Sequence, residues 1–85
     1  MELGKGKVAM KGELGRRIRT ARAYGQMSQT EMARRLGISS ATLIRYEKGQ
    51  REIPSLARRE LAQRVVDLTG MDERWVMEAV GGPGV

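Results

Sequence analysis

Residues 28–54 read SQTEMARRLGISSATLIRYEKGQREIP, and this stretch determines the fold more clearly than any other part of the chain. A serine precedes each of the segments 29–36 and 40–47. A serine there accepts a hydrogen bond from a backbone N–H that the first helical turn leaves unpaired. Glycine follows the two segments at Gly37 and Gly49, where it can adopt the left-handed conformation that ends a helix. The stretch therefore predicts two short helices joined by a tight turn.

The side chains of this stretch fit such a helix pair. Ser28 and Glu31 match the capping box, in which the side chain of each residue bonds the backbone N–H of the other. Ala33 is small enough to let the two helices approach closely, and Leu43 fills the angle between them. The first residues of 40–47 then stay exposed. Two short helices joined by a glycine-containing turn form a helix-turn-helix, whose second helix enters the major groove of DNA.

Three further helices are predicted around this pair. Apolar side chains recur at helical spacing in 13–24 and 55–69, and Gly25 ends the first of these helices. Asp72 caps a short closing helix that runs through Val80. No stretch alternates as a strand does, so the fold class is all-α, a compact five-helix domain. The predicted core consists of Leu14, Ile18, Met32, Ala33, Leu36, Leu43, Leu61, Val65 and Leu68.

The chain of 85 residues is short enough to form a single domain. Residues 1–12 contain glycine and lysine without helical spacing, and they are predicted to form a flexible basic arm. Residues 13–80 form the globular domain, and the glycine-rich tail 81–85 is predicted to be disordered.

Positive charge is concentrated in the N-terminal part of the chain. The whole sequence has 16 Lys or Arg and 10 Asp or Glu, a net charge of +6. Residues 1–50 contain 11 basic and 4 acidic residues, whereas 51–85 contain 5 and 6. This asymmetry is typical of a protein that binds a polyanion, although a merely solvated surface explains the charge equally well. No apolar run is long enough for a membrane span and no basic face carries bulky aromatic anchors, so we expect a cytoplasmic protein without membrane contact.

The residue types argue against catalysis and metal binding. The chain has no Cys and no His, which excludes disulfides, thiol chemistry and the usual zinc sites. A Ser-His-Asp triad is likewise excluded, and the carboxylates are explained by helix caps and surface ion pairs. We therefore expect a protein that is not an enzyme and that uses no cofactor and no metal.

The stretch 28–54, with its flanking helices, resembles the lambda-repressor-like family, also called the XRE or Cro/repressor family. The segment TGMDERWVM likewise resembles the closing helix of that family, so the likeness covers about 13–80. It implies a DNA-binding domain, such as a phage immunity repressor or a Cro-like protein. The matching residues are Ser28, Gln29, Glu31, Met32, Ala33, Leu36, Gly37, Ile38, Ser39, Leu43, Glu47, Gly49 and Pro54.

The resemblance implies a role for each residue of the motif. Arg45 is the best candidate for reading a base, because one guanidinium can bond O6 and N7 of guanine together. Ile44 departs from the family, which commonly has a small polar residue there. It is either half-buried or in contact with a thymine methyl. The residues expected at base edges are Ser40, Ala41, Ile44 and Arg45, with Thr42 at base or backbone.

Other residues are implied in backbone contacts or in holding the motif together. Arg22 and Glu47 occupy positions that form an ion pair between the first and third helices in some relatives. Ser28, Glu31, Ala33, Gly37, Leu43 and Gly49 shape the motif itself. The residues expected at phosphates are Gln29, Ser39, Thr42, Lys48 and Arg51.

Several large or charged residues outside the motif have competing interpretations. Arg16, Arg17 and Arg19 are predicted to form a solvated face that lies far from the 40–47 helix. Arg34 and Arg35 either contact phosphate or only solubilise their helix. A place in the core is predicted for Trp75, because large aromatic side chains in small domains are mostly buried.

The sequence as a whole predicts a repressor that binds double-stranded DNA and occludes a promoter. The alternatives are the DNA-binding antitoxin of a toxin–antitoxin pair, a protein-interaction adaptor with the same fold, and an activator. One recognition helix reads few base pairs, so we expect two copies to pair weakly, possibly only on DNA, over an inverted-repeat operator. The surface expected to make this contact is the closing helix, with Trp75, Val76, Met77 and Val80.

Overall fold

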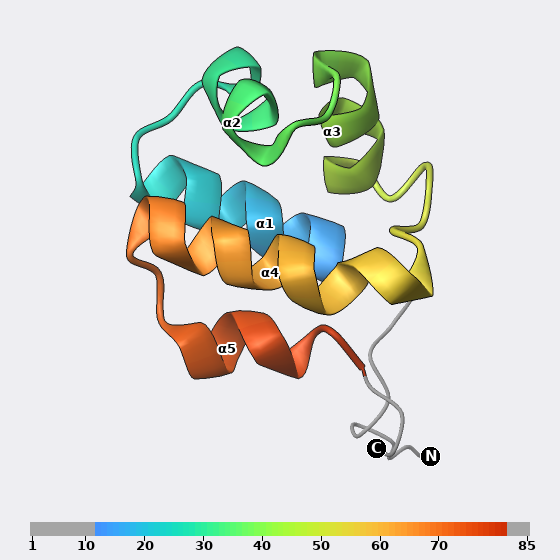
Figure 1. The fold of residues 1–85 in the computed structure, drawn as a ribbon, viewed down its shortest axis with the longest axis vertical. Coiled ribbons are helices and arrows are strands. Elements are labelled where there is room, and N and C mark those ends of the chain that lie inside the picture. Colours follow the sequence, from blue (N-terminus) through green and yellow to red (C-terminus); the bar gives the residue numbers. More distant parts are fainter. Residues whose placement is uncertain (1–11, 82–85) are drawn as a thin grey trace.

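In a computed structural model of the chain, residues 12–81 are described, and all of their regular structure is helical (Figure 1). The prediction of an all-α fold with five helices is confirmed for these residues. Residues 1–11 and 82–85, which hold most of the predicted arm and tail, lie outside the described part. The helices are α1 (Glu13–Tyr24), α2 (Gln29–Leu36), α3 (Ser40–Glu47), α4 (Ser55–Thr69) and α5 (Glu73–Glu78).

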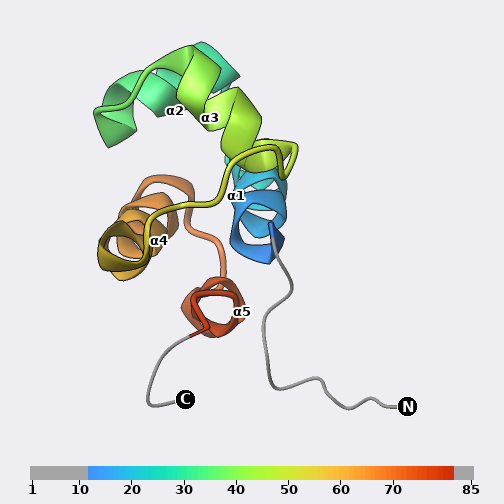
Figure 2. The ribbon, with the colours of Figure 1, turned by 90° about the vertical axis from the view of Figure 1, so that its right-hand side faces the viewer.

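The helices α1 and α4 form the centre of the domain. They lie side by side and run in the same direction (Figure 1). The pair α2 and α3 lies on one side of them, and α5 lies on the other side (Figure 2). This arrangement leaves one face of α3 free of neighbouring helices, at the end of the domain opposite α5.

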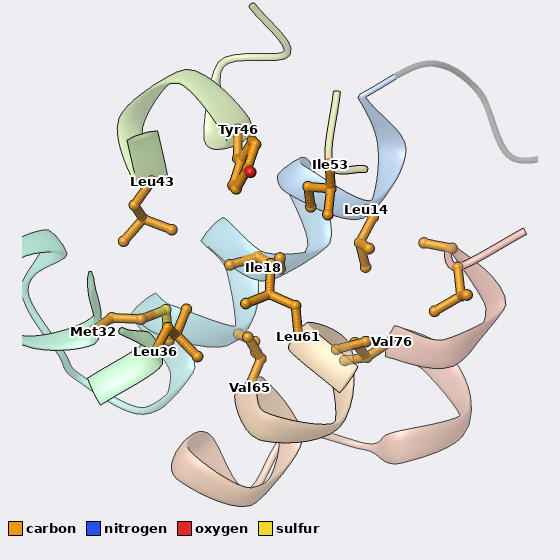
Figure 3. Packing of buried hydrophobic residues seen from close by; sticks show 14 of the residues in the cluster. Leu14, Ile18, Met32, Leu36, Leu43, Tyr46, Ile53, Leu61, Val65 and Val76 are labelled. Atoms are coloured by element: carbon orange, nitrogen blue, oxygen red, sulfur yellow. The ribbon is translucent and has the colours of Figure 1, made fainter. Parts of the chain in front are cut away.

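The core fills the space between α1, α4 and the helices on either side (Figure 3). Of the predicted core residues, all are buried except Leu68, which is half-buried. The buried stripe of α4 runs along Leu61, Ala62, Val65 and Thr69. Leu68 therefore lies at the edge of the stripe, and the Thr69 hydroxyl is buried while donating a hydrogen bond of 2.7 Å to the Val65 carbonyl. The buried hydrophobic residues outside the predicted core set are Ala21, Tyr46, Ile53, Ala62, Val76, Ala79 and Val80.

The helix caps mostly follow the predicted chemistry. Ser28 Oγ accepts from the Glu31 N–H at 3.0 Å, and Asp72 accepts from the Trp75 N–H at 2.9 Å. The closing helix ends at Glu78 rather than at Val80, because the backbone N–H groups of Ala79 and Val80 bond carbonyls only three residues back instead of four. Arg58 of α4 then donates to the carbonyls of Ala79 and Val80, at 3.2 and 3.0 Å, and ties this end of the chain to α4.

Two predicted helix signals work differently in the structure. The Glu31 carboxylate accepts from Arg34 and Arg35 instead of completing the capping box with Ser28. Gly25 ends α1 without a left-handed conformation, since its φ is −82°, and the following Gln26 has the positive φ of 58°. Gly25 instead lies close to α4: a Cβ added there would be in tight contact with Thr69, at 3.1 Å.

Candidate nucleic-acid interface

The turn between α2 and α3 has the geometry that the sequence predicted. Gly37 has a φ of 76°, and its neighbour Ile38 donates to the Ala33 carbonyl at 3.0 Å. This closes α2 and lets the chain enter α3 almost at once. Leu43 is fully buried and points toward Met32 and Leu36 (Figure 3), so it fills the angle between the two helices as expected. The described structure therefore contains a helix-turn-helix.

A buried carboxylate fixes α3 to α1 and α2. Glu47 has only 2% of its side chain exposed, and its two oxygens accept from Arg22 Nε at 2.8 Å and Arg22 Nη2 at 3.0 Å. The predicted ion pair is therefore present in bidentate form. Gln29 Nε2 also donates to Glu47, at 3.1 Å, and Arg22 Nη1 donates to the Met27 carbonyl at 3.0 Å. Because every oxygen of this buried charge has a donor, the network holds three helices in one arrangement.

A close backbone contact at Gly15 of α1 also fixes α3 to α1, and the sequence did not predict it. A Cβ added at Gly15 would lie 1.8 Å from the Tyr46 carbonyl oxygen and 2.6 Å from its carbon. Only glycine allows the backbones of α1 and α3 to approach this closely. The signal was present as a glycine inside an otherwise helical pattern, which usually costs stability and so calls for a packing reason.

The opposite face of α3 carries side chains that the fold does not use. Ala41, Arg45 and Lys48 are exposed, whereas Ser40, Thr42 and Ile44 are half-buried. Ile44 was expected to be either half-buried or in contact with a thymine methyl, and the structure shows it half-buried. The turn and the following loop add Ser39, whose Oγ accepts from the Thr42 N–H at 3.1 Å, and the exposed Arg51.

The arginines of the molecule divide into paired and unpaired groups. Within residues 12–81, no carboxylate lies at ion-pair distance from Arg45, Lys48 or Arg51. By contrast, Arg34 and Arg35 both pair with Glu31 at 2.8 Å, and their hydrogen bonds lower the pKa of that carboxyl below its ordinary value. Arg19, Arg59 and Arg74 are also exposed without such a pair, so the exposed face of α3 and the loop that follows carry part of the positive charge available to a partner.

Arg17 is not the solvated residue that the sequence predicted. It donates to the Trp75 carbonyl at 2.6 Å and pairs with Glu13 at 2.7 Å and Glu78 at 3.2 Å. Its hydrogen bond is the main reason that the pKa of the Glu13 carboxyl is lowered. The guanidinium also lies 4.8 Å from the centre of the Trp75 ring, so the indole is half-buried beneath an arginine rather than fully in the core. This cluster joins α1 to α5.

The part of the chain that the structure describes offers neither a metal site nor a membrane span. No group of three or more acidic side chains there could hold a metal ion. None of the helices in that part is both long and apolar enough to cross a bilayer.

Comparison with known proteins places the motif in a family. Residues 13–76, which include α1–α4 and much of α5, match the helix-turn-helix domain family. The chain belongs to this family. Among curated proteins and among solved structures, nothing matches the chain. As a helix-turn-helix domain, the protein carries the fold of a DNA-binding regulator, and α3 occupies the position of the recognition helix.

Proposed function

We propose that this protein is a sequence-specific transcriptional repressor that places α3 in the major groove of a promoter and so blocks access to it. The observation that carries the proposal is the contrast between the two faces of α3. Its inner face is fixed by Leu43 and Glu47, and its outer face presents Arg45 and Lys48 without a carboxylate partner within residues 12–81. A rigidly held helix with free cations fits a polyanion whose groove carries an ordered pattern of donors and acceptors.

The outer face supplies residues for reading bases. Arg45 is exposed and is the residue best suited to bond guanine in a bidentate way. Ala41 is exposed at the start of α3, where it fits a thymine methyl. Ser40 and Ile44 are half-buried beside them and complete the proposed reading surface.

Backbone contacts are assigned to the rim of this surface. Lys48 and Arg51 flank Gly49 and are exposed where the chain leaves α3. Ser39 and Thr42 lie at the N-terminus of α3, whose unpaired N–H groups favour a phosphate. Gln29 is the remaining candidate, although its amide also donates to Glu47.

The proposal includes two copies on an inverted-repeat operator, but the expected contact surface needs revision. Val76 and Val80 of the closing region are buried in the core, with 0% and 8% of their surface exposed. Only the half-buried Trp75 and Met77 remain from that set. A contact formed by these two residues is small, which supports pairing that depends on DNA.

Selection of bound sites from random duplex DNA tests the proposal directly. We expect an inverted repeat whose half-site centres lie about 34–36 Å apart, one helical turn of DNA. Affinity should also fall steeply with salt, with a slope that reflects about 4–8 neutralised phosphates. Failure to enrich any site, together with a flat salt dependence, would contradict DNA binding and favour the adaptor. Enrichment of a single asymmetric half-site at full affinity would contradict only the paired arrangement.

A further inference from the structure

The N-terminal end of α1 lies directly against the C-terminal end of α3. The Gly15–Tyr46 backbone contact brings the two helices together, and a Cβ added at Gly12 would lie 3.2 Å from the Gly49 Cα. The first turns of α1 are therefore neighbours of the loop that contains Lys48 and Arg51. The sequence predicted instead that Arg16, Arg17 and Arg19 form a solvated face far from the recognition helix.

Arg16 carries its charge into this junction. Its Nη1 atom lies 3.3 Å from the position of a Cβ added at Gly12 and 3.8 Å from the position of one added at Gly49. The guanidinium thus lies beside Gly49, the glycine that separates Lys48 from Arg51 in the chain. With 53% of its side chain exposed, it is open to a partner that approaches the loop.

Within residues 12–81, the ion pair of Arg16 is long and exposed. Glu13 pairs with Arg17 at 2.7 Å, whereas its distance to Arg16 is 3.4 Å. One carboxylate is therefore shared by two guanidinium groups, and Arg17 has the shorter bond and the more buried side chain. An exposed pair at the longer distance contributes little to stability, so Arg16 is not needed to hold α1 in place.

We propose that α1 forms part of the DNA-contacting surface and that Arg16 bonds a phosphate of the same duplex, next to the phosphates contacted by Lys48 and Arg51. This inference rests on the proposed function. It extends the backbone-contacting rim from α3 and its loop to the N-terminal turns of α1, and Gly15 is the residue that makes the extension possible.

Arg64 of α4 provides a matched control for Arg16. It is 52% exposed and pairs with a glutamate on its own helix, Glu60, at 2.9 Å. Its helix packs on α1, α2 and α5 but has no extensive contact with α3. Arg16→Ala and Arg64→Ala therefore remove the same charge from equally exposed sites, one beside the recognition helix and one away from it.

The test is the salt dependence of binding to a fluorescently labelled duplex of mixed sequence, measured by anisotropy with the full chain. The slope of log K against log salt should become shallower by about 0.9 in Arg16→Ala, the value for one phosphate, and should stay unchanged in Arg64→Ala. Between about 50 and 200 mM salt, this corresponds to about 3.5-fold less loss of affinity in the Arg16 variant. Arg16→Lys, which keeps the charge, should keep the slope of the original protein.

Any other pattern of salt slopes contradicts the inference, and the pattern shows which assumption is wrong. Equal slopes in all variants would remove Arg16 from the interface while leaving α3 in place. An equal decrease in Arg16→Ala and Arg64→Ala would show an effect of net charge alone. If the original protein shows no salt-dependent binding to duplex DNA, the proposed function fails and the contribution of α1 fails with it. Thermal melts of all variants establish that each is folded under the binding conditions.

Discussion

The two faces of α3 are built in opposite ways. The inner face has Leu43 with no exposed surface, Glu47 bonded by Arg22 and Gln29, and a backbone contact with Gly15. The outer face has side chains that pair with no carboxylate in residues 12–81. Under the proposed function, stability and recognition are therefore assigned to different sides of the same eight-residue helix. Substitutions on the inner face should lower stability, and those on the outer face should change only binding.

The largest effect is expected from breaking the buried ion pair. Arg22→Ala leaves the Glu47 carboxylate buried with only Gln29 as a donor, which should cost about 3–5 kcal/mol in the free energy of unfolding. Arg22→Met combined with Glu47→Leu should cost less than Arg22→Ala, because no buried charge is then left unpaired. Urea denaturation of Arg22→Met, of Glu47→Leu and of the double variant measures this coupling. Additive losses would show that the two side chains act independently.

Truncation of Leu43 should have the next largest effect. Leu43→Ala opens a cavity between α2 and α3 and should lower the free energy of unfolding by about 2–5 kcal/mol. At temperatures where the variant is still folded, its DNA affinity should change much less than its stability. A loss below about 1 kcal/mol would mean that α2 and α3 close over the gap and that Leu43 is not essential to their angle.

Gly15→Ala should have a smaller effect on stability but should also disturb binding. The added Cβ meets backbone atoms of Tyr46, which cannot rotate away, so α1 and α3 must separate. Overpacking of this kind costs about 1–3 kcal/mol. Because the displacement tilts the recognition helix, affinity for the selected site should fall relative to affinity for mixed-sequence DNA. Val65→Ala, a core change in α4, is the control: it should lower stability without changing that ratio.

The outer face should show no loss of stability at all. Arg45→Ala should weaken preference at one or two base positions by about 1–3 kcal/mol, with an unchanged unfolding midpoint. Arg51→Ala should weaken binding to all sequences alike and make the salt slope shallower by about one. Binding selections repeated with each variant separate the two roles. A uniform loss in both would identify Arg45 as a phosphate contact.

Local signals predicted the helices and their order well. Ser28, Ser39 and Asp72 cap helices in the structure because a cap depends on residues two or three positions away, and such relations are visible in a sequence. The Arg22–Glu47 pair was available only through the family resemblance, since no spacing rule brings residues so far apart in the chain together.

Most failures of prediction share one physical cause. Whether Arg17 is solvated or buried depends on where α5 lies, and a helical pattern gives the face of α1 but not its neighbour. The same holds for Gly15, which must be glycine only because the Tyr46 backbone lies against it. It also holds for Val80, which is buried in the core and is therefore not available for a contact between copies. Leu68 was misplaced for a local reason: the buried stripe of α4 contains Leu61 and Val65 as predicted, but it continues to Thr69, four residues after Val65, rather than to Leu68.

The unused outer face of α3 has a consequence for how such a protein can change over generations. Since Ala41, Arg45 and Lys48 take no part in the core or in the ion pairs of residues 12–81, replacing them imposes little folding cost. Under the proposed function, a duplicated copy of this domain could therefore acquire a new operator through substitutions at these few positions while its scaffold stays constant. For the same reason, the outer-face residues of α3 from another member of the family could be grafted onto this domain. Leu43, Glu47 and the Gly15 contact would still hold the helix in place.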